Sequence, residues 1–425
     1  MLEFFLDWML YASWALLGLV FFQVVFFVGL SSRHHARHKR HHPRKLAKTP
    51  LVSVLVPSYN EGITLENCIQ SLMNQSYENY EILIIDDGSN DDTLQIARQL
   101  ARKYSPRIRL VICRNNGGKA TALNRGIARA RGDILVCVDA DSIFIHDTIE
   151  QLVLSFQDPD VAAVGGNVKV ANRKKSLSRQ QSLEYISGLT LQRKAFAHLG
   201  CMQVISGAIG AFRRDALLAI GGYSTTTIVE DMDTTIELAR QGYKVVYNPS
   251  AIAYTEAPES LNAFLKQRHR WTYGSFQVLA KHRRTLIQRK ARRMGLIGLP
   301  YFMLAPWLNV LVSLLFILIL PRAFVSENNG QFFLMIGTSC LLQALLVCYA
   351  LVMDKEDKRL LGIAVIHGLF YYHLISYTSV KAGISYCLSK NEKSWNKLER
   401  YGKNIRPELG QTPALVPVVA ADETV

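Results

Sequence analysis

A stretch of 23 residues without a charged side chain, from Trp8 to Leu30, constrains the fold of this chain most. About 20 apolar residues are enough for a helix to cross the hydrocarbon core of a bilayer. Three further apolar runs lie near the C-terminus, at Met294–Leu320, Gly330–Met353 and Leu360–Val380. We therefore predict a membrane protein. The first run is expected to stay as an anchor, because its basic residues follow it, whereas a secretory signal carries them before it.

The charges of the chain agree with a membrane protein. A mean hydropathy of +0.10 together with a net charge of +15 requires that apolar and basic residues are segregated. The run Arg33–Lys45 holds five of the eleven histidines and follows the first apolar stretch. Basic residues beside a span hold that end on the cytoplasmic side and contact anionic lipid. A metal-binding tract and a basic arm for nucleic acid are the alternatives.

The cysteines exclude two classes of small scaffold. There are seven of them, an odd number, with no CxxC pair and no tight cluster. A disulfide framework and a structural zinc site are therefore not expected.

The C-terminal topology stays open at this point. Residues Asp354–Arg359 are all charged, so this turn is expected to reach water on the cytoplasmic side. Three C-terminal crossings would then place residues 390–425 outside, although their Lys and Arg residues favour the inside. Pro300 and Pro306 allow the first C-terminal run to lie partly in the interface or to re-enter.

Composition divides the chain into six predicted parts. They are an N-terminal anchor (1–32), a basic juxtamembrane segment (33–49), a soluble cytoplasmic domain (50–260), interfacial helices (261–293), C-terminal membrane helices (294–389) and a polar tail (390–425).

The soluble domain begins with a strand and helix alternation. Strands are predicted at 52–57, 81–86, 108–113 and 134–139, and helices at 64–74, 91–104 and 119–131. This order indicates a mainly parallel, doubly wound α/β sheet, whose ligand crevice lies at the carboxyl ends of the strands.

Polar and acidic residues follow three of these strands, in the segments Pro57–Glu61, Asp86–Ser89 and Asp139–Asp141. Each segment alone is ordinary turn or helix-cap chemistry. Together in one crevice they would repel one another unless a cation neutralised them. Mg²⁺ or Mn²⁺, held by Asp139 and Asp141, fits this pattern and would bridge to nucleotide phosphates. Lys119 either contacts a phosphate or begins a solvated helix.

The segments Pro57–Glu61, Asp86–Ser89, Asp139–Asp141, Glu230–Asp231 and Gln267–Trp271, in this order between terminal spans, resemble the processive family 2 glycosyltransferases. That family includes the synthases of cellulose, chitin, hyaluronan and poly-N-acetylglucosamine. The resemblance implies a nucleotide-sugar-binding α/β domain of the GT-A type on the cytoplasmic face of the inner membrane. It also implies a membrane channel for the polymer.

The resemblance assigns roles to individual residues. Asp231 would be the catalytic base, and Asp139 and Asp141 would bind the diphosphate through the metal. The acceptor and diphosphate would contact Glu230 and the motif residues Gln267, Arg270 and Trp271, which share one helix face. The remaining contacts to the nucleotide sugar would come from Ser58, Asn60, Glu61, Asp87 and Lys119.

Within the family, segments 206–214 and 228–233 are most similar to the poly-β-1,6-N-acetylglucosamine synthases. The resemblance therefore implies an inverting, processive transfer from UDP-N-acetylglucosamine. A growing polysaccharide is the acceptor, the lipid bilayer is a partner, and a small membrane partner subunit is compatible with this assignment. The alternatives are another UDP-sugar polysaccharide synthase, a non-processive lipid glycosyltransferase, and a silent membrane scaffold.

The basic residues between Lys281 and Arg293 are expected to form a helix on the inner membrane surface. Because lipid explains most of the basic residues, no nucleic-acid partner is expected.

Overall fold

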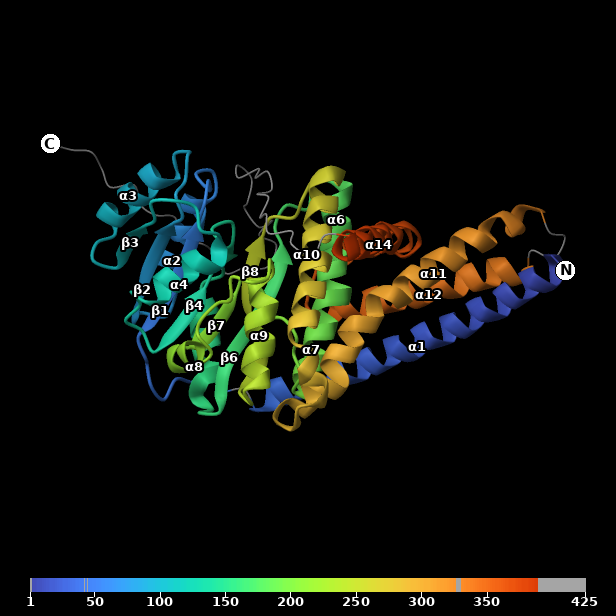
Figure 1. The fold of residues 1–425 in the computed structure, drawn as a ribbon, viewed down its shortest axis with the longest axis horizontal. Helices are drawn as coiled ribbons and strands as arrows, with labels where there is room; N and C mark the ends of the chain where they lie inside the picture. The colour runs from blue at the N-terminus through green and yellow to red at the C-terminus, as the bar shows by residue number, and fades with distance from the viewer. Residues whose placement is uncertain (1, 42, 44, 326–329, 389–425) are drawn as a thin grey trace.

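The computed structural model describes residues 2–41, 43, 45–325 and 330–388. Figure 1 shows three layers along the long axis of the molecule. An α/β domain lies at one end, helices that run across the long axis lie in the middle, and a bundle of long helices extends to the other end.

The α/β domain is built on one eight-stranded sheet within the described residues, in the order β3-β2-β1-β4-β7-β6-β8-β5. Strands β1, β2, β3 and β4 are mutually parallel, and β6 pairs in parallel with β8, whereas β7 and β5 run antiparallel to their neighbours. The strands are β1 (Val52–Ser58), β2 (Tyr80–Asp86), β3 (Ile108–Ile112), β4 (Ile134–Cys137), β5 (Ile143–Phe144), β6 (Val161–Val170), β7 (Gly210–Arg213) and β8 (Lys244–Thr255).

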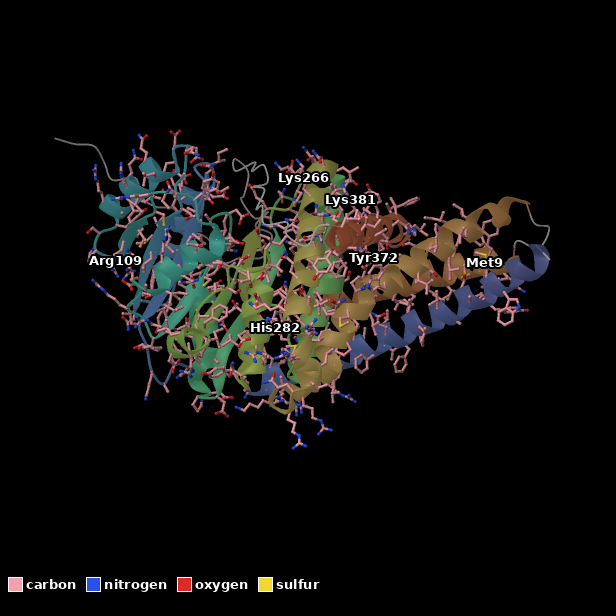
Figure 2. All side chains as sticks on the ribbon, viewed as in Figure 1. Met9, Arg109, Lys266, His282, Tyr372 and Lys381 are labelled. Carbon is pink, nitrogen blue, oxygen red and sulfur yellow. The ribbon has the colours of Figure 1, made fainter. Side chains whose placement is uncertain are left out.

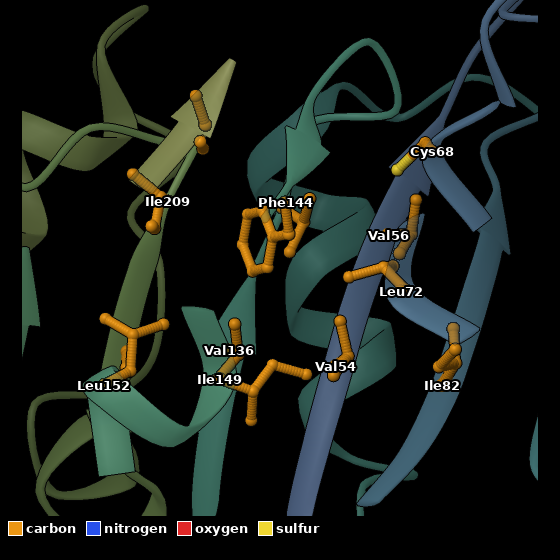
Figure 3. Packing of buried hydrophobic residues seen from close by; sticks show 14 of the residues in the cluster. Val54, Val56, Cys68, Leu72, Ile82, Val136, Phe144, Ile149, Leu152 and Ile209 are labelled. Carbon is orange, nitrogen blue, oxygen red and sulfur yellow. The ribbon is translucent and has the colours of Figure 1, made fainter. Parts of the chain in front are cut away.

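Both faces of the sheet are buried, because successive side chains of a strand point to opposite faces. In β1, Val54 and Val56 pack on one side and Leu55 packs on the other. Figure 3 shows the first of these cores, in which Ile149 of α5 lies beside Val136 and Val54, and Leu152 of α5 lies on the side of Ile209. Burial on both faces explains the unbroken apolar runs of the strands.

Shorter helices accompany the sheet. They are α2 (Leu65–Met73), α3 (Thr93–Lys103), α4 (Lys119–Ile127), α5 (Thr148–Leu154), α8 (Arg214–Ala219) and α9 (Glu230–Arg240), with a 3-10 turn, η1, at Ser155–Gln157. The four predicted strands and three predicted helices are confirmed, with ends shifted by at most a few residues. Strands β5 to β8 were not predicted, so the sequence analysis covered only half of the sheet.

The middle layer contains helices that run across the long axis (Figure 1). One is a continuous helical run made of α6 (Ser176–Leu183), the π-helix η2 (Glu184–Thr190) and α7 (Leu191–Leu199). The second is α10 (Leu261–Lys281), and the third is α14 (Tyr372–Leu388), which packs against α10 and α11. A 3-10 turn η6 (Lys358–Ile363), helix α13 (Ala364–Ile366) and a π-helix η7 (His367–Tyr371) lead into α14.

The bundle consists of α1 (Leu2–His41), α11 (Leu299–Val325) and α12 (Gly330–Met353), and α1 contacts both of the other helices. Figure 2 shows Met9 of α1 and Arg109 of the α/β domain at opposite ends of the molecule. Four helical segments are long and apolar enough to cross a membrane: Trp8–Arg40, Met294–Leu318, Gly330–Met353 and Lys358–Leu388. The predicted apolar segments are thus helical, and Pro300 and Pro306 do not interrupt α11.

The structure corrects the prediction of a surface helix between Lys281 and Arg293. This segment forms two 3-10 turns, η3 (Arg283–Ile287) and η4 (Arg289–Ala291), followed by the π-helix η5 (Met294–Gly298). Basic residues therefore lie on short turns at the base of α11.

A second correction concerns two acids of the turn Asp354–Arg359, which was expected to reach water. Glu356 forms ion pairs with Lys169 at 2.8 Å and Arg173 at 2.6 Å, and Asp354 pairs with the buried Lys194. The turn lies on the side of the α/β domain, as predicted, and Lys355, Asp357, Lys358 and Arg359 are exposed. The side chains of Asp354 and Glu356 are instead buried against basic side chains of that domain.

Two histidines of the basic segment after the anchor contact the α/β domain. Helix α1 continues to His41 and packs along α7. His34 lies against the ring of Tyr247, and His38 shares a hydrogen bond of 3.2 Å with Ser250. These histidines therefore contact protein, and the lipid contact of the Lys and Arg residues stays a prediction. The predicted polar tail lies outside the described residues.

Candidate active site

A cavity of about 300 Å³ lies at the carboxyl ends of β1 and β4, between the sheet and α10. It is where the crevice of an α/β sheet was predicted. Most of the predicted site residues line it, namely Glu61, Lys119, Asp139, Asp141, Glu230, Asp231, Gln267, Arg270 and Trp271.

Lys119, the first residue of α4, connects two of the acidic segments. Its Nζ atom lies 2.5 Å from Asp139 Oδ1 and 3.2 Å from Glu230 Oε1. Burial alone would lower the pKa of this ammonium group, but the carboxylates of Asp139, Glu230 and Asp231 outweigh burial and raise the pKa. Lys119 is therefore a fixed positive charge in the cavity, not the start of a solvated helix.

Asp231 lies in the first turn of α9, where the helix dipole favours a negative charge. Its carboxylate accepts hydrogen bonds from the backbone N–H groups of Met232 at 2.8 Å and Gly207 at 3.3 Å. Burial and then the neighbouring Glu230 carboxylate raise the pKa of Asp231 to about 6, although Lys119 opposes this shift. A pKa nearer to neutrality suits a general base.

Asp139 and Asp141 follow β4 and both line the cavity. The Asp141 carboxylate accepts hydrogen bonds from the hydroxyls of Ser142 and Thr255, each at 3.4 Å. No group of three His, Cys, Asp or Glu side chains is arranged for a metal in the part of the chain that the structure describes. The carboxylates of Asp139 and Asp141 nevertheless suit Mg²⁺ or Mn²⁺. Mg²⁺ commonly binds one or two carboxylates, and phosphate and water oxygens complete its coordination sphere.

The charges that line the cavity also favour a cation. Six acids face three bases: Glu61, Asp139, Asp141, Glu230, Asp231 and Glu256 against Lys119, Arg193 and Arg270. An anionic diphosphate would be repelled by this excess of acids unless a cation entered with it.

Gln267, Arg270 and Trp271 of α10 all line the cavity, which confirms that they share one helix face. The N-terminus of α10 is capped by Ser260, whose Oγ accepts a hydrogen bond of 3.2 Å from the N–H of Ala263. Gln267 is buried, and its Oε1 atom has no hydrogen-bond partner among the described residues.

Comparison with known proteins identifies the family. The family described as glycosyltransferase-like family 2 matches residues 49–274, which is more than half of the chain. The chain belongs to this family. The resemblance found in the sequence is therefore confirmed.

Curated relatives are similar over most of the chain. The chain is 32% identical over 271 residues to the poly-beta-1,6-N-acetyl-D-glucosamine synthase of Staphylococcus aureus (strain COL), a match covering 62% of the chain and 65% of the relative. It is 28% identical over 320 residues to the synthase of the same name from Staphylococcus epidermidis, covering 73% of the chain and 77% of the relative. The chain thus spans just under two thirds of the length of the first relative.

A solved structure shows the same fold. The mannosyltransferase PcManGT from Pyrobaculum calidifontis, in complex with GDP-Man and Mn²⁺, matches with a TM-score of 0.61 at 22% identity, covering 90% of this chain and 100% of that one. This likeness confirms the predicted GT-A type of fold.

Three predicted nucleotide contacts of the glycosyltransferase lie outside the lining of the cavity, namely Ser58, Asn60 and Asp87. The Asp87 carboxylate accepts hydrogen bonds from the N–H groups of Gly117 at 3.1 Å and Gly118 at 2.8 Å. Asn60 has a positive φ of 53°, and its Oδ1 accepts a hydrogen bond of 2.7 Å from the N–H of Asn90. In this structure these side chains therefore brace the loops after β1 and β2.

Asp233 has surroundings different from those of Asp231. Its carboxylate accepts hydrogen bonds from Thr227 at 3.0 Å and Lys281 at 2.7 Å, and it contacts His282 Nε2 at 2.7 Å. Burial would raise the pKa of Asp233, but His282 and Lys281 outweigh burial and lower it. Asp233 joins α9 to the end of α10 and does not line the cavity.

The sequence analysis missed several residues of the site, among them Glu256, Gly207 and Arg193. Gly207 donates its N–H to Asp231, and a Cβ atom at this position would overlap Lys119 Nζ, so the end of the lysine would have to shift. Arg193 of α7 lines the cavity and comes from a segment without a recognised motif. Gly207 lies in a quoted segment, but its packing against Lys119 is visible only in the fold.

Proposed function

We propose that the protein is a membrane-embedded, inverting and processive glycosyltransferase that polymerises N-acetylglucosamine from UDP-N-acetylglucosamine into an exported poly-β-1,6-linked polysaccharide. The observation that carries this proposal is the position of Asp231, buried with a raised pKa in the same cavity as Lys119, Arg270 and Trp271. The names of the two Staphylococcus relatives support the choice of polymer.

The proposed reaction is a single displacement. A hydroxyl of the acceptor sugar attacks the anomeric carbon of the donor, a new C–O bond forms, and the bond to the diphosphate breaks. Asp231 takes the hydroxyl proton, and UDP leaves with the bonding electrons. Lys119 and Arg270 balance the charge of the leaving diphosphate, Glu230 holds Lys119 in place, and Trp271 offers its ring to the acceptor sugar.

Asp139 and Asp141 would hold Mg²⁺ or Mn²⁺ in the loaded enzyme. The cation would act as a Lewis acid that stabilises negative charge on the diphosphate. Two findings support this part: the excess of acids around the cavity, and the carboxylate pair that follows β4.

The uridine is proposed to lie beside the cavity, against the loops after β1 and β2. Glu61 lines the cavity, and Ser58, Asn60 and Asp87 belong to the same two loops. The N–H of Asn60 donates to Ser89 Oγ at 2.9 Å, which ties the loops together. These nucleotide contacts stay predictions.

A second cavity, of about 490 Å³, supports export. It lies among α1, η2, α11, α12 and α14, and it shares Leu189, Gln192 and Phe302 with the lining of the active site. Polar side chains from several helices face it, namely Gln23, Asn309, Ser313 and Gln343. We propose that the growing chain passes from Trp271 into this cavity.

For the topology, we propose that α1, α11 and α12 cross the inner membrane and that α14 lies along its cytoplasmic surface. In Figure 1, α14 is seen end-on whereas the other three lie in the plane of the picture, so α14 crosses their direction. In this topology the N-terminus lies outside, and the chain crosses the membrane three times. The end of α14 therefore lies on the cytoplasmic side, together with the α/β domain. A small membrane partner subunit stays a prediction.

One experiment tests the donor and the metal together. The purified protein, in detergent, is offered a panel of radiolabelled UDP-sugars with Mg²⁺, with Mn²⁺ or with excess EDTA, and the product is digested with linkage-specific glycosidases. We expect polymer from UDP-N-acetylglucosamine alone, its disappearance in EDTA, and its return with the metal. If polymer formed only with UDP-glucose, the proposed donor would be wrong. If turnover were complete in EDTA, the reaction would not need the proposed metal.

A further inference from the structure

Arg268 lies inside the Gln267–Trp271 motif but faces away from the cavity, toward a buried cluster at the contact of three elements. These elements are α10, η2 and η7. The guanidinium donates two parallel hydrogen bonds to Glu184, from NH1 to Oε1 at 2.7 Å and from NH2 to Oε2 at 2.6 Å. Tyr371 donates its hydroxyl to the same Glu184 Oε2 at 2.6 Å.

The cluster is rigidly built. Side chains of Arg268 and Glu184 are only 6% and 11% exposed. His367 of η7 contacts Gln180 Oε1 at 2.8 Å and stacks on Tyr371 at 4.7 Å between ring centroids. A buried, bidentate pair of this kind holds one geometry, because the planar guanidinium matches the carboxylate.

The same guanidinium lies over the ring of Trp271. The distance from its central carbon to the ring centroid is 4.5 Å, and the ring of Phe264 lies 5.1 Å away. Arg268 Nε is buried without a hydrogen-bond partner among the described residues, which fits a group enclosed by aromatic rings. Trp271 in turn lines the catalytic cavity and is only partly buried. Arg268 is therefore the contact that joins the buried cluster to the cavity wall.

We propose that Arg268 is a positioning residue: anchored by Glu184 and Tyr371, it fixes the Trp271 indole in the orientation that receives the acceptor sugar. This inference rests on the proposed function, in which Trp271 contacts the acceptor. Both anchors come from π-helical segments, which often occur at functional sites. Because η7 leads into α14, the orientation of the ring is coupled to the membrane-side helices.

If the Arg268–Glu184 ion pair only stabilised the fold, a different experimental result would be expected. Replacing a buried ion pair by apolar residues of similar volume is often neutral for stability. The double variant Arg268→Met/Glu184→Leu is therefore expected to fold and melt like the parent, but it lacks the planar group over Trp271. If the pair only supported the fold, this variant would be fully active.

The test combines a physical and a kinetic measurement. Hydroxyl-radical footprinting of the full-length protein reads the exposure of Trp271 without any turnover. Kinetics are measured on Arg268→Lys and on the double variant, with oligosaccharide acceptors and whichever UDP-sugar the parent uses. The matched control is Arg213→Lys, because Arg213 is also held by hydrogen bonds beside an aromatic ring, that of Phe156, away from the cavity.

We expect oxidation of Trp271 to rise several-fold in both Arg268 variants and to stay unchanged in Arg213→Lys. The acceptor KM should rise about tenfold, the donor KM should not change, and both effects should vanish in a Trp271→Ala background. Unchanged oxidation of Trp271, or an acceptor effect that persists without Trp271, would overturn the proposal. A parent that rejects UDP-N-acetylglucosamine would contradict only the proposed donor.

Discussion

Lys119 forms ion pairs with acidic residues from two different segments of the cavity. It pairs with Asp139 and Glu230, and its approach depends on the missing Cβ of Gly207. In the proposed reaction, this ammonium group would exchange part of its contact with the carboxylates for phosphate oxygens. Asp231, the proposed base, accepts two hydrogen bonds from the backbone, which hold its carboxylate in place.

The first prediction separates the two aspartates of α9. Asp231→Asn keeps the size of the side chain but cannot take the proton, so turnover should fall by about 10²–10⁴-fold while UDP affinity stays unchanged. Polymer formation and calorimetric UDP binding check this. Asp233→Asn is the control: it should keep measurable turnover but melt at a lower temperature, because it weakens contacts to Lys281 and His282. If Asp231→Asn still formed polymer, Asp231 would not be the base, and its role would be limited to stabilising the N-terminus of α9.

The second prediction concerns the loss of activity at low pH. Asp231 must be deprotonated to act, and its pKa is raised to about 6, so kcat/KM should fall as the pH drops through about 6. In Glu230→Gln this fall of kcat/KM should occur at a lower pH, because the Glu230 carboxylate is one of the groups that raise the pKa of Asp231. A parent profile that stays flat down to the ordinary range of aspartates would contradict the assignment.

At the scale of elements, the layer of crossing helices decides how the cavity is closed. Helix α10 supplies one wall of the active site, and η2 contributes to both cavities. The turn between α12 and η6 fastens the bundle to the domain through Glu356, which pairs with Lys169 and Arg173. The spacing of Gln267, Arg270 and Trp271 alone predicted that they share one face of α10. The sequence of the turn, in contrast, does not indicate that Lys169 and Arg173 are the partners of Glu356.

The third prediction concerns this turn. Burial would raise the pKa of Glu356, but Arg173 and Lys169 outweigh burial and lower it to about 2. Such a carboxylate stabilises the fold above its ordinary pKa of 4.5, and this contribution is lost as the pH falls from 4.5 through about 2. The melting temperature of the parent should therefore fall across that window. Glu356→Gln should melt lower at neutral pH, since it leaves buried cations unpaired at about 3–5 kcal/mol, and should respond less to acid.

The control for this turn is a more exposed pair. Lys175 and Glu259 lie 2.9 Å apart, but the lysine side chain is 61% exposed. Glu259→Gln should barely change the melting temperature, because exposed pairs contribute little. Equal effects of Glu356→Gln and Glu259→Gln would show that the turn does not fasten the bundle.

At the scale of the whole molecule, the proposed topology resolves a conflict that the apolar runs alone left open. In Figure 1, α14 runs across the direction of α1, α11 and α12. If those three helices cross the membrane, the chain returns to the side of the α/β domain before α14. Under this arrangement the basic residues after Leu388 agree with the preference of Lys and Arg for the cytoplasmic side.

The fourth prediction tests this topology with the exposed Cys387 at the end of α14. In a background with the other cysteines replaced, Cys387 should react with a membrane-impermeant thiol reagent in inverted vesicles but not in intact cells. Lys103→Cys in the α/β domain should behave alike, and Trp8→Cys at the far end of α1 should show the opposite pattern. Labelling of Cys387 from outside would make α14 a fourth span.

The sequence by itself determined the features that depend on local chemistry. Apolar runs specify helices long enough to cross a membrane, alternating strands and helices specify the parallel half of the sheet, and the spacing of Gln267, Arg270 and Trp271 specifies one helix face. Only the tertiary structure decided which charges meet, because Lys119, Gly207 and Asp231 are distant in the chain and their contacts depend on packing. The burial of Glu356, the antiparallel strand β7 and the direction of α14 are likewise set by long-range contacts, for which a single sequence carries no local signal.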